Sequence, residues 1–247
     1  MRIQSHRKKI TCFIVAAAII TIAAAIIVGY GFYLKQLATN PSPHPNQHNA
    51  LLANDTREQL PEIDWQHWLA VNPDIVGWIY LPNTPINYPV VQAPDYDRDY
   101  YLSHDVYRNW NIWGCPYIDA DLAQAPLDAK QVIIYGHHMN DKTMFSAISS
   151  FVDKDFAESH QNVYFFTPSF TYEFTVDFVR VVSGEIPDKQ IFFPSQTHFE
   201  NWYHITKNQA VVRLAQQENT QTPEQVLSLV TCSYYRYGNE RTIVYAT

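Results

Sequence analysis

A series of short apolar runs follows Pro73 and leaves few folds open to this chain. Each run is rich in β-branched and aromatic residues and is bounded by Pro, Asn or Asp, a pattern typical of short strands separated by turns. We expect about eight strands, at Val76–Leu81, Ile86–Val91, Pro116–Ile118, Gln131–Tyr135, Val163–Phe166, Tyr172–Val182, Val226–Ser233 and Thr242–Ala246. The sequence therefore predicts a mainly β fold, either a closed barrel or a sandwich.

Three other segments show helical rather than alternating spacing of apolar residues. Asp55–Asn72 has this spacing but is broken by Pro61, so we expect a short N-terminal helical element there. Thr143–Phe151 and His198–Asn208 interrupt the series of strands and are also predicted to be helical.

The N-terminal part of the chain is organised differently. Residues 10–34 carry no charged side chain, and this run can cross a bilayer core of about 30 Å at about 1.5 Å per residue. Arg2, Arg7, Lys8 and Lys9 precede the run, so the positive-inside rule predicts a cytoplasmic N-terminus. A cleavable signal peptide is the alternative, but the apolar run continues to Leu34, which favours an uncleaved anchor.

The predicted organisation has four parts. Residues 1–9 form a basic cytoplasmic tail, residues 10–34 a transmembrane signal anchor, and residues 35–54 a flexible linker rich in Pro and Asn. Residues 55–247 form one extracellular domain, and with 47% hydrophobic residues the chain can bury one sizeable core. We therefore expect a monomeric single-pass protein of the cell membrane.

Composition excludes several classes of function. The formal net charge is −7 and the only cluster of Lys and Arg is the N-terminal tail, which argues against a nucleic-acid partner. Asp95, Asp97 and Asp99 begin like a calcium loop, but Tyr100 and Val106 stand where such a loop needs glycine and glutamate. No zinc-ligand spacing or phosphate-binding glycine loop is present, so we expect no metal and no cofactor.

Three residues point to acyl transfer at a thiol. Cys232 lies near the end of a predicted strand, Arg241 directly precedes the next one, and His137 follows a strand that breaks at Gly136. Such chemistry needs a thiolate nucleophile, an acid for the departing amine and a donor for the oxyanion, and these side chains can supply all three. Because side chains alternate along strands, an antiparallel pairing of the last two strands could bring Arg241 level with Cys232, although the sequence leaves the register open.

Each candidate has an alternative. His138 competes with His137 because a turn at a strand end could aim either imidazole at the site, and Arg236 competes with Arg241 although it lies on a predicted hairpin loop. A disulfide between Cys115 and Cys232 would instead consume the nucleophile.

The chain resembles the sortases, and among them the class B enzymes, from about Trp65 to Ala246. Tyr135-Gly136-His137-His138-Met139 resembles the class B histidine motif, and Leu229-Val230-Thr231-Cys232 resembles the Leu-x-Thr-Cys signature, with valine where serine is common. Asn72–Ile79 and Ile86–Gln92 resemble two early family segments, and Arg241 stands where the family places its arginine. The order and joint presence of these fragments are specific to the family.

The resemblance implies an eight-stranded β-barrel with an N-terminal helical extension and a helix, within Ser195–Asn208, before the cysteine strand. It also implies a cysteine transpeptidase that cleaves a C-terminal sorting signal of the Asn-Pro-x-Thr or Leu-Pro-x-Thr kind after Thr and holds a thioester on Cys232. The partners would be surface proteins that carry the signal, and an amine acceptor from a peptidoglycan precursor or a pilin in a Gram-positive wall. Cys232, His137 and Arg241 would be catalytic, and Thr231 and His138 would contact the substrate.

Two other functions remain open on the sequence. A papain-like cysteine peptidase would hydrolyse its substrate, but in that class the cysteine lies early in the chain, whereas Cys232 comes late. A catalytically silent module could keep the barrel as a peptide-binding platform.

Overall fold

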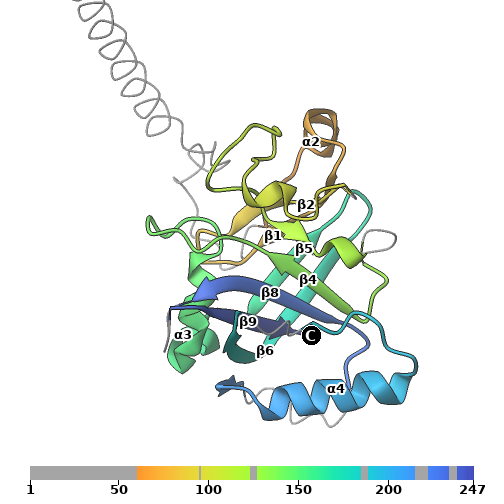
Figure 1. Ribbon diagram of the computed structural model, residues 1–247, viewed down its shortest axis with the longest axis vertical. Coiled ribbons are helices and arrows are strands. Elements are labelled where there is room, and N and C mark those ends of the chain that lie inside the picture. Colours follow the sequence, from red (N-terminus) through yellow and green to blue (C-terminus); the bar gives the residue numbers. More distant parts are fainter. Residues whose placement is uncertain (1–59, 95, 123–126, 185–188, 215–221, 234–237) are drawn as a thin grey trace, which may run out of the picture. The chain divides into compact units, whose positions relative to one another are not determined.

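The protein is built around a closed ring of eight strands, seen in a computed structural model that describes residues 60–94, 96–122, 127–184, 189–214, 222–233 and 238–247 (Figure 1). The strands of the ring are β1 (Ile75–Tyr80), β2 (Asn87–Gln92), β3 (Tyr117–Ile118), β4 (Gln131–Tyr135), β5 (Asn162–Phe166), β6 (Thr171–Ser183), β8 (Val226–Ser233) and β9 (Glu240–Ala246). All eight predicted strands are therefore confirmed, with ends that shift by one or two residues.

The order of pairing distinguishes the barrel from the sandwich. The sheet runs β5-β1-β2-β3-β4-β8-β9-β6, and a further pairing of β5 with β6 closes the ring. The β2–β3 and β4–β8 pairs are parallel, and the other pairs of the ring are antiparallel. A ninth strand, β7 (Val212–Arg213), pairs only with β6 and was not predicted, because two residues carry no periodic signal.

Side chains alternate between the interior of the barrel and an outer face. Leu227 and Leu229 of β8 are buried in the interior cluster, whereas Val226 and Val230 are buried in a second cluster with Phe199 of α4. Burial of each such side chain contributes about 1.5–3 kcal/mol. Cys232 points to the same face of the sheet as Val230, because side chains alternate along a strand. Strand β8 is therefore packed on both faces up to the cysteine.

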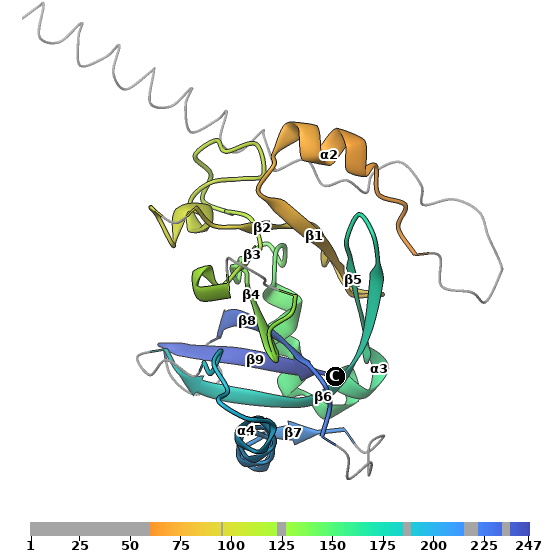
Figure 2. The same cartoon turned by 90° about the vertical axis from the view of Figure 1, so that its right-hand side faces the viewer.

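Helix α4 (Gln196–Asn208) covers that outer face and confirms the helix expected before the cysteine strand (Figure 2). Ser195 caps its N-terminus by accepting a hydrogen bond from the His198 backbone N–H at 3.3 Å. Its inner side is tied to β6, because buried Asp177 accepts hydrogen bonds from Tyr203 at 2.5 Å and from Lys207 at 2.7 Å.

The other predicted helices need correction. The N-terminal element is helix α2 (Trp65–Val71), shorter than expected because Asp64 caps it; of the predicted segment 55–72, residues 55–59 lie outside the described residues. The helix predicted at Thr143–Phe151 is a 3-10 helix at Ser146–Val152, followed by the unpredicted helix α3 (Lys154–Ser159). Asp153 separates the last two elements and caps α3 through its side chain. Two short 3-10 turns, Tyr100–Leu102 and Ala120–Leu122, complete the elements.

The predicted location in a membrane is corrected as well. In the described part of the chain no helix is long and apolar enough to cross a bilayer. The apolar run 10–34, on which the prediction was based, lies outside the described residues, as do the tail 1–9 and the linker 35–54.

Candidate active site

Cys232 and Arg241 face each other across two neighbouring strands. In the antiparallel pairing of β8 with β9, Cys232 is the direct partner of Arg241, and Thr231 is the partner of Thr242. Both Cys232 and Arg241 are partly exposed, and the Arg241 guanidinium donates a hydrogen bond to the Glu240 carbonyl at 3.1 Å. The structure thus supplies the register that the sequence left open, and it brings the thiol and the cation to the same level.

His137 is presented at the end of β4 by a glycine that has no room for a side chain. The Gly136 N–H donates to the Val230 carbonyl at 3.1 Å and so extends the contact between β4 and β8 by one residue. A Cβ at Gly136 would lie 2.4 Å from the ring of Phe145. The Phe145 N–H in turn donates to the His137 carbonyl at 2.8 Å. The close packing of Phe145 therefore requires glycine before the histidine.

The imidazole of His137 is held from a different part of the chain. Its Nε2 lies 2.7 Å from the carbonyl oxygen of Leu102, in the long connection between β2 and β3. When this nitrogen carries a proton, the contact is a hydrogen bond that leaves Nδ1 for other chemistry.

The turn after His137 is braced by two hydroxyl groups. Ser146 Oγ accepts from the Met139 N–H at 2.7 Å and lies 2.7 Å from the Thr143 carbonyl, to which it donates. The Met144 N–H donates to the Tyr88 hydroxyl at 3.1 Å. Met144 has a φ of 54°, a left-handed conformation uncommon for a residue with a side chain, so this turn is held by its surroundings.

His138 and Thr231 both connect the end of β4 with the end of β8. His138 Nδ1 lies 2.9 Å from the carbonyl oxygen of Cys232. Thr231 is 2% exposed, and its hydroxyl donates to the Gly136 carbonyl at 2.8 Å. The structure therefore places both residues in backbone contacts that join the two halves of the site, and their predicted contact with substrate stays a prediction.

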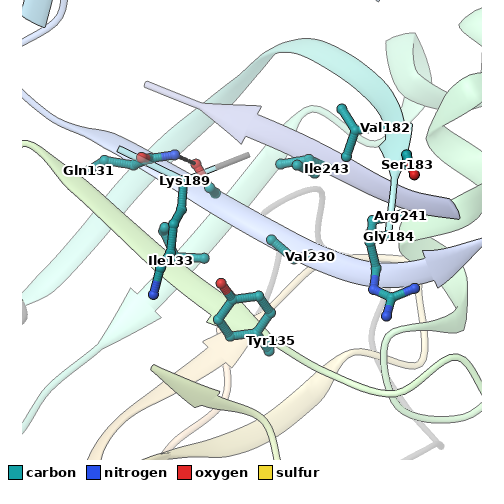
Figure 3. Close-up of a pocket in the computed structure, with 11 residues that line it drawn as sticks. Gln131, Ile133, Tyr135, Val182, Ser183, Gly184, Lys189, Val230, Arg241 and Ile243 are labelled. Atoms are coloured by element: carbon teal, nitrogen blue, oxygen red, sulfur yellow. Dashed lines mark hydrogen bonds between the residues drawn. The ribbon is translucent and has the colours of Figure 1, made fainter. Parts of the chain in front are cut away.

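The three candidate catalytic residues line one cavity of about 610 Å³. Its wall includes Cys232, His137 and Arg241, together with Arg98, Asp99, Leu102, Tyr117, Asp119, Ala120, Tyr135, Gly136, Lys189, Val230 and Thr231. A smaller cavity of about 200 Å³ adjoins it and shares Tyr135, Lys189, Val230 and Arg241 (Figure 3). Gln131 donates to the Ser228 hydroxyl at 2.9 Å at the far end of this smaller cavity (Figure 3).

Two phenols on the cavity wall are kept neutral. Burial raises the pKa of Tyr117, and the carboxylates of Asp99 and Asp119 raise it further. Burial also raises the pKa of Tyr135, as does Asp119, which accepts a hydrogen bond from its hydroxyl at 2.9 Å. At neutral pH both side chains therefore remain hydrogen-bond donors.

Sequence reasoning missed Asp119 and Lys189. Asp119 directly follows a predicted strand, a position where a buried carboxylate could have been suspected. Lys189 lies in a segment without any motif, and the residues next to it in the sequence give no signal that it lies at the site.

Cys115 and Cys232 do not form a disulfide. Cys115 and Cys232 are both free thiols, which excludes the alternative disulfide. Cys115 is buried, with its Sγ 3.6 Å from the Pro89 carbonyl of β2, and burial raises the pKa of its thiol. The competing Arg236 lies outside the described residues. Among the residues that are described, no group of His, Cys, Asp or Glu is placed to hold a metal ion.

Comparison with known proteins identifies the family. A sortase-domain model matches residues 79–247. A sortase B of Listeria monocytogenes is 30% identical over 178 residues, which cover 72% of this chain and 68% of that protein. A sortase B of Staphylococcus aureus is 25% identical over 240 residues, which cover 95% of this chain and 96% of that protein.

Solved structures of sortase B proteins have a similar fold. The structure of a Staphylococcus aureus sortase B–substrate complex matches with a TM-score of 0.63 and 25% identity, over 73% of this chain and 82% of that chain. The fold is also that of Clostridium perfringens sortase B, with a TM-score of 0.66 and 23% identity over 73% of this chain and 97% of that chain. The chain therefore belongs to the sortase family, in its class B, and is an enzyme of the cysteine transpeptidase type.

Proposed function

We propose that this enzyme cleaves a C-terminal sorting signal after threonine and joins the threonine carbonyl to an amine through a thioester on Cys232. The observation that carries the proposal is the cross-strand pairing of Cys232 with Arg241, at a cavity that His137 also lines. We further propose residues 55–247 as the catalytic domain, within which the family match covers residues 79–247.

In the first step the Cys232 thiolate attacks the threonine carbonyl carbon, and the carbonyl oxygen takes up the negative charge. Arg241 lies level with the thiol and donates to that oxygen or to the substrate backbone. His137 protonates the departing amine as the scissile C–N bond breaks, which leaves the acyl group on sulfur.

In the second step an amine enters the cavity and attacks the thioester. His137 removes the proton that the amine must lose, the C–S bond breaks, and the thiolate is restored. The acceptor that we propose is an amine of a peptidoglycan precursor or a pilin lysine. Exclusion of water from the cavity decides between transfer and hydrolysis.

The sorting signal that we propose is of the Asn-Pro-x-Thr-Gly/Asn kind. The smaller cavity adjoins the one that holds Cys232, so a bound peptide can place its threonine at the thiol and its earlier residues along the shared wall. The surface proteins that carry such signals would be the natural substrates.

Peptide processing tests the proposal. The full chain is incubated with Asn-Pro-x-Thr and Leu-Pro-x-Thr peptides, with and without an added amine such as triglycine, and products are identified by mass. We expect cleavage after threonine and an amine-dependent ligated product that Cys232→Ala abolishes. Cys115→Ala is the matched control, because Cys115 is buried outside the cavity and its loss should leave the reaction intact.

The other outcomes separate the competing functions. Cys232-dependent cleavage that ignores the amine would identify a peptidase instead. Absence of any Cys232-dependent product with every peptide would contradict the proposal and favour a silent peptide-binding module.

A further inference from the structure

Lys189 connects two segments that lie far apart in the sequence. Its ammonium Nζ lies 3.0 Å and 2.9 Å from the two carboxylate oxygens of Asp119, and 2.7 Å from an oxygen of Asp121. Lys189 precedes helix α4, whereas Asp119 and Asp121 follow β3. An ammonium has three N–H donors, and three carboxylate oxygens lie around this one, so each N–H has a partner in the protein although the side chain is 32% exposed.

The carboxylate that receives Lys189 is rigidly held. The Asp119 side chain is 5% exposed and also accepts a hydrogen bond from the Tyr135 hydroxyl at 2.9 Å. Its backbone N–H donates to the Ile133 carbonyl at 3.0 Å, which ties it to β4. A carboxylate buried to this degree needs a cation close by, because desolvation of an unpaired charge is costly.

Lys189 begins the segment 189–195, which leads into α4 along the outer face of the barrel. The Gln190 N–H donates to the Gln131 side chain at 3.2 Å, and Ile191 packs on both apolar clusters. Phe193 stacks edge-on against Phe199 of α4, with ring centroids 5.1 Å apart. Apolar contacts thus hold the end of the segment near α4, and the ion pair holds the end near the cavities.

The same lysine lines both cavities. It shares this position with Tyr135, Val230 and Arg241, one of the three candidate catalytic residues (Figure 3). Of segment 189–195 only Lys189 lines the cavities, so its own side chain is the part of the segment that contributes to the wall shared by the smaller cavity and the one that holds Cys232.

We propose that Lys189 is a positioning residue: its ion pairs with Asp119 and Asp121 hold the start of segment 189–195, and the lysine side chain itself, in place at the wall shared by the two cavities, and so set how tightly the peptide substrate is bound. This inference rests on the proposed function, because it assigns the wall to the same peptide. Lys189 acts through the position of the wall and takes no part in the bond-making steps.

The experiment compares Lys189→Met with Lys154→Met in the full chain. Lys154 is the control, because it also makes an ion pair with a carboxylate, that of Glu158 at 3.5 Å on helix α3, and lines neither cavity. We expect Lys189→Met to raise KM for the sorting peptide about tenfold with kcat changed by less than about threefold. We also expect amide hydrogen exchange of residues 190–193 to become about tenfold faster, and alkylation of Cys232 to keep its rate. Lys154→Met should change none of these.

Two further variants test the pairing itself. Lys189→Arg keeps the cation and should restore most of the peptide affinity. The double variant Asp119→Asn with Lys189→Met removes both charges of the Lys189–Asp119 ion pair. The KM of this double variant should rise no more than that of Lys189→Met alone, because the same ion pair is lost in either case. The double variant also avoids the unpaired buried carboxylate if the single variant folds poorly.

The readouts keep the two proposals apart. If the unmodified protein processes no peptide, the proposed function fails, and hydrogen exchange still shows whether Lys189 holds the wall. If peptides are processed but Lys189→Met leaves both KM and exchange as in the unmodified protein, the role of Lys189 is refuted. A fall in kcat with an unchanged KM would also overturn it.

Discussion

Cys232 and Arg241 are cross-strand partners, near the end of β8 and the start of β9. Their juxtaposition depends on strand register, because a slip by one residue would turn either side chain to the opposite face. That register is secured over the length of both strands, from the pair Leu227 and Ala246 to the pair Ser233 and Glu240. The geometry of the thiol and the guanidinium is thus a property of the whole β8–β9 ladder.

Removal of the guanidinium should reduce the rate of the chemical step. We expect Arg241→Ala to lower kcat for peptide cleavage by about 10²–10³, as found when one donor to an oxyanion is removed. Arg213→Ala is the control, since the Arg213 guanidinium contacts the Asn208 carbonyl at 2.7 Å and lines neither cavity. Steady-state kinetics on a cleavable peptide checks this, and a kcat within threefold of the unmodified enzyme would contradict a role for Arg241 at the oxyanion.

Gly136 should not tolerate even a methyl group. Gly136→Ala would place Cβ 2.4 Å from the ring of Phe145, and we expect the free energy of unfolding to fall by about 1–3 kcal/mol through overpacking. Peptide cleavage should fall as well, because His137 follows directly. Gly238→Ala is a matched control, since a Cβ there has no atom within 4 Å. Urea unfolding of both variants measures the difference, and equal stabilities would show that Phe145 can move aside.

His138 should matter for the position of Cys232. We expect His138→Ala to lower kcat about tenfold through misplacement of the cysteine carbonyl that it contacts, while His137→Ala abolishes turnover. The control is His160→Ala, because His160 Nδ1 makes a similar contact, 2.8 Å from the Phe156 carbonyl, on an element that lines neither cavity. If His138→Ala lost as much activity as His137→Ala, the roles of the two imidazoles would have to be exchanged.

The two cysteines of the barrel should differ sharply in reactivity. Cys115 is 5% exposed and burial raises its pKa, so little thiolate forms, whereas Cys232 opens to the cavity. In the native protein, iodoacetamide at pH 8 should modify the peptide that contains Cys232 and spare the peptide that contains Cys115. Both should react after denaturation. Peptide mapping by mass spectrometry decides this, and early labelling of Cys115 would show that the buried site opens.

Stability should decline at alkaline pH. Burial raises the pKa of Tyr101, Tyr117, Tyr135 and Tyr203 above the usual value near 10. As the pH rises, these phenols ionise first in the unfolded chain, because their pKa is lower there. Their contribution to the free energy of unfolding is therefore complete below about pH 10. Above that pH it falls by up to about 1.4 kcal/mol per pH unit for each group. Urea unfolding between pH 8 and pH 11 measures the slope, and a flat profile would mean that the phenols ionise in the folded protein.

The strands, and the placement of the three candidate catalytic residues near strand ends, could be predicted from the sequence because both are local signals. Alternation over five to eight residues defines β4 and β8, and the breaks at Gly136 and after Cys232 mark where side chains emerge at strand ends. The helix before the cysteine strand could also be predicted, because its apolar residues recur at helical spacing; it ends at Asn208, as expected. Prediction from the sequence fails for segments with no periodic signal, such as the two-residue strand β7.

Only the tertiary structure decided what those elements do together. Closure of the ring by β5 and β6, the register that places Arg241 opposite Cys232, and the contact of His138 with the Cys232 carbonyl all join residues that are distant along the chain. The ion pair of Lys189 with Asp119 spans 70 positions and leaves no mark on the local sequence around either residue. Side-chain patterns report the face and the element to which a residue belongs, whereas pairing across such separations follows from packing of the complete barrel.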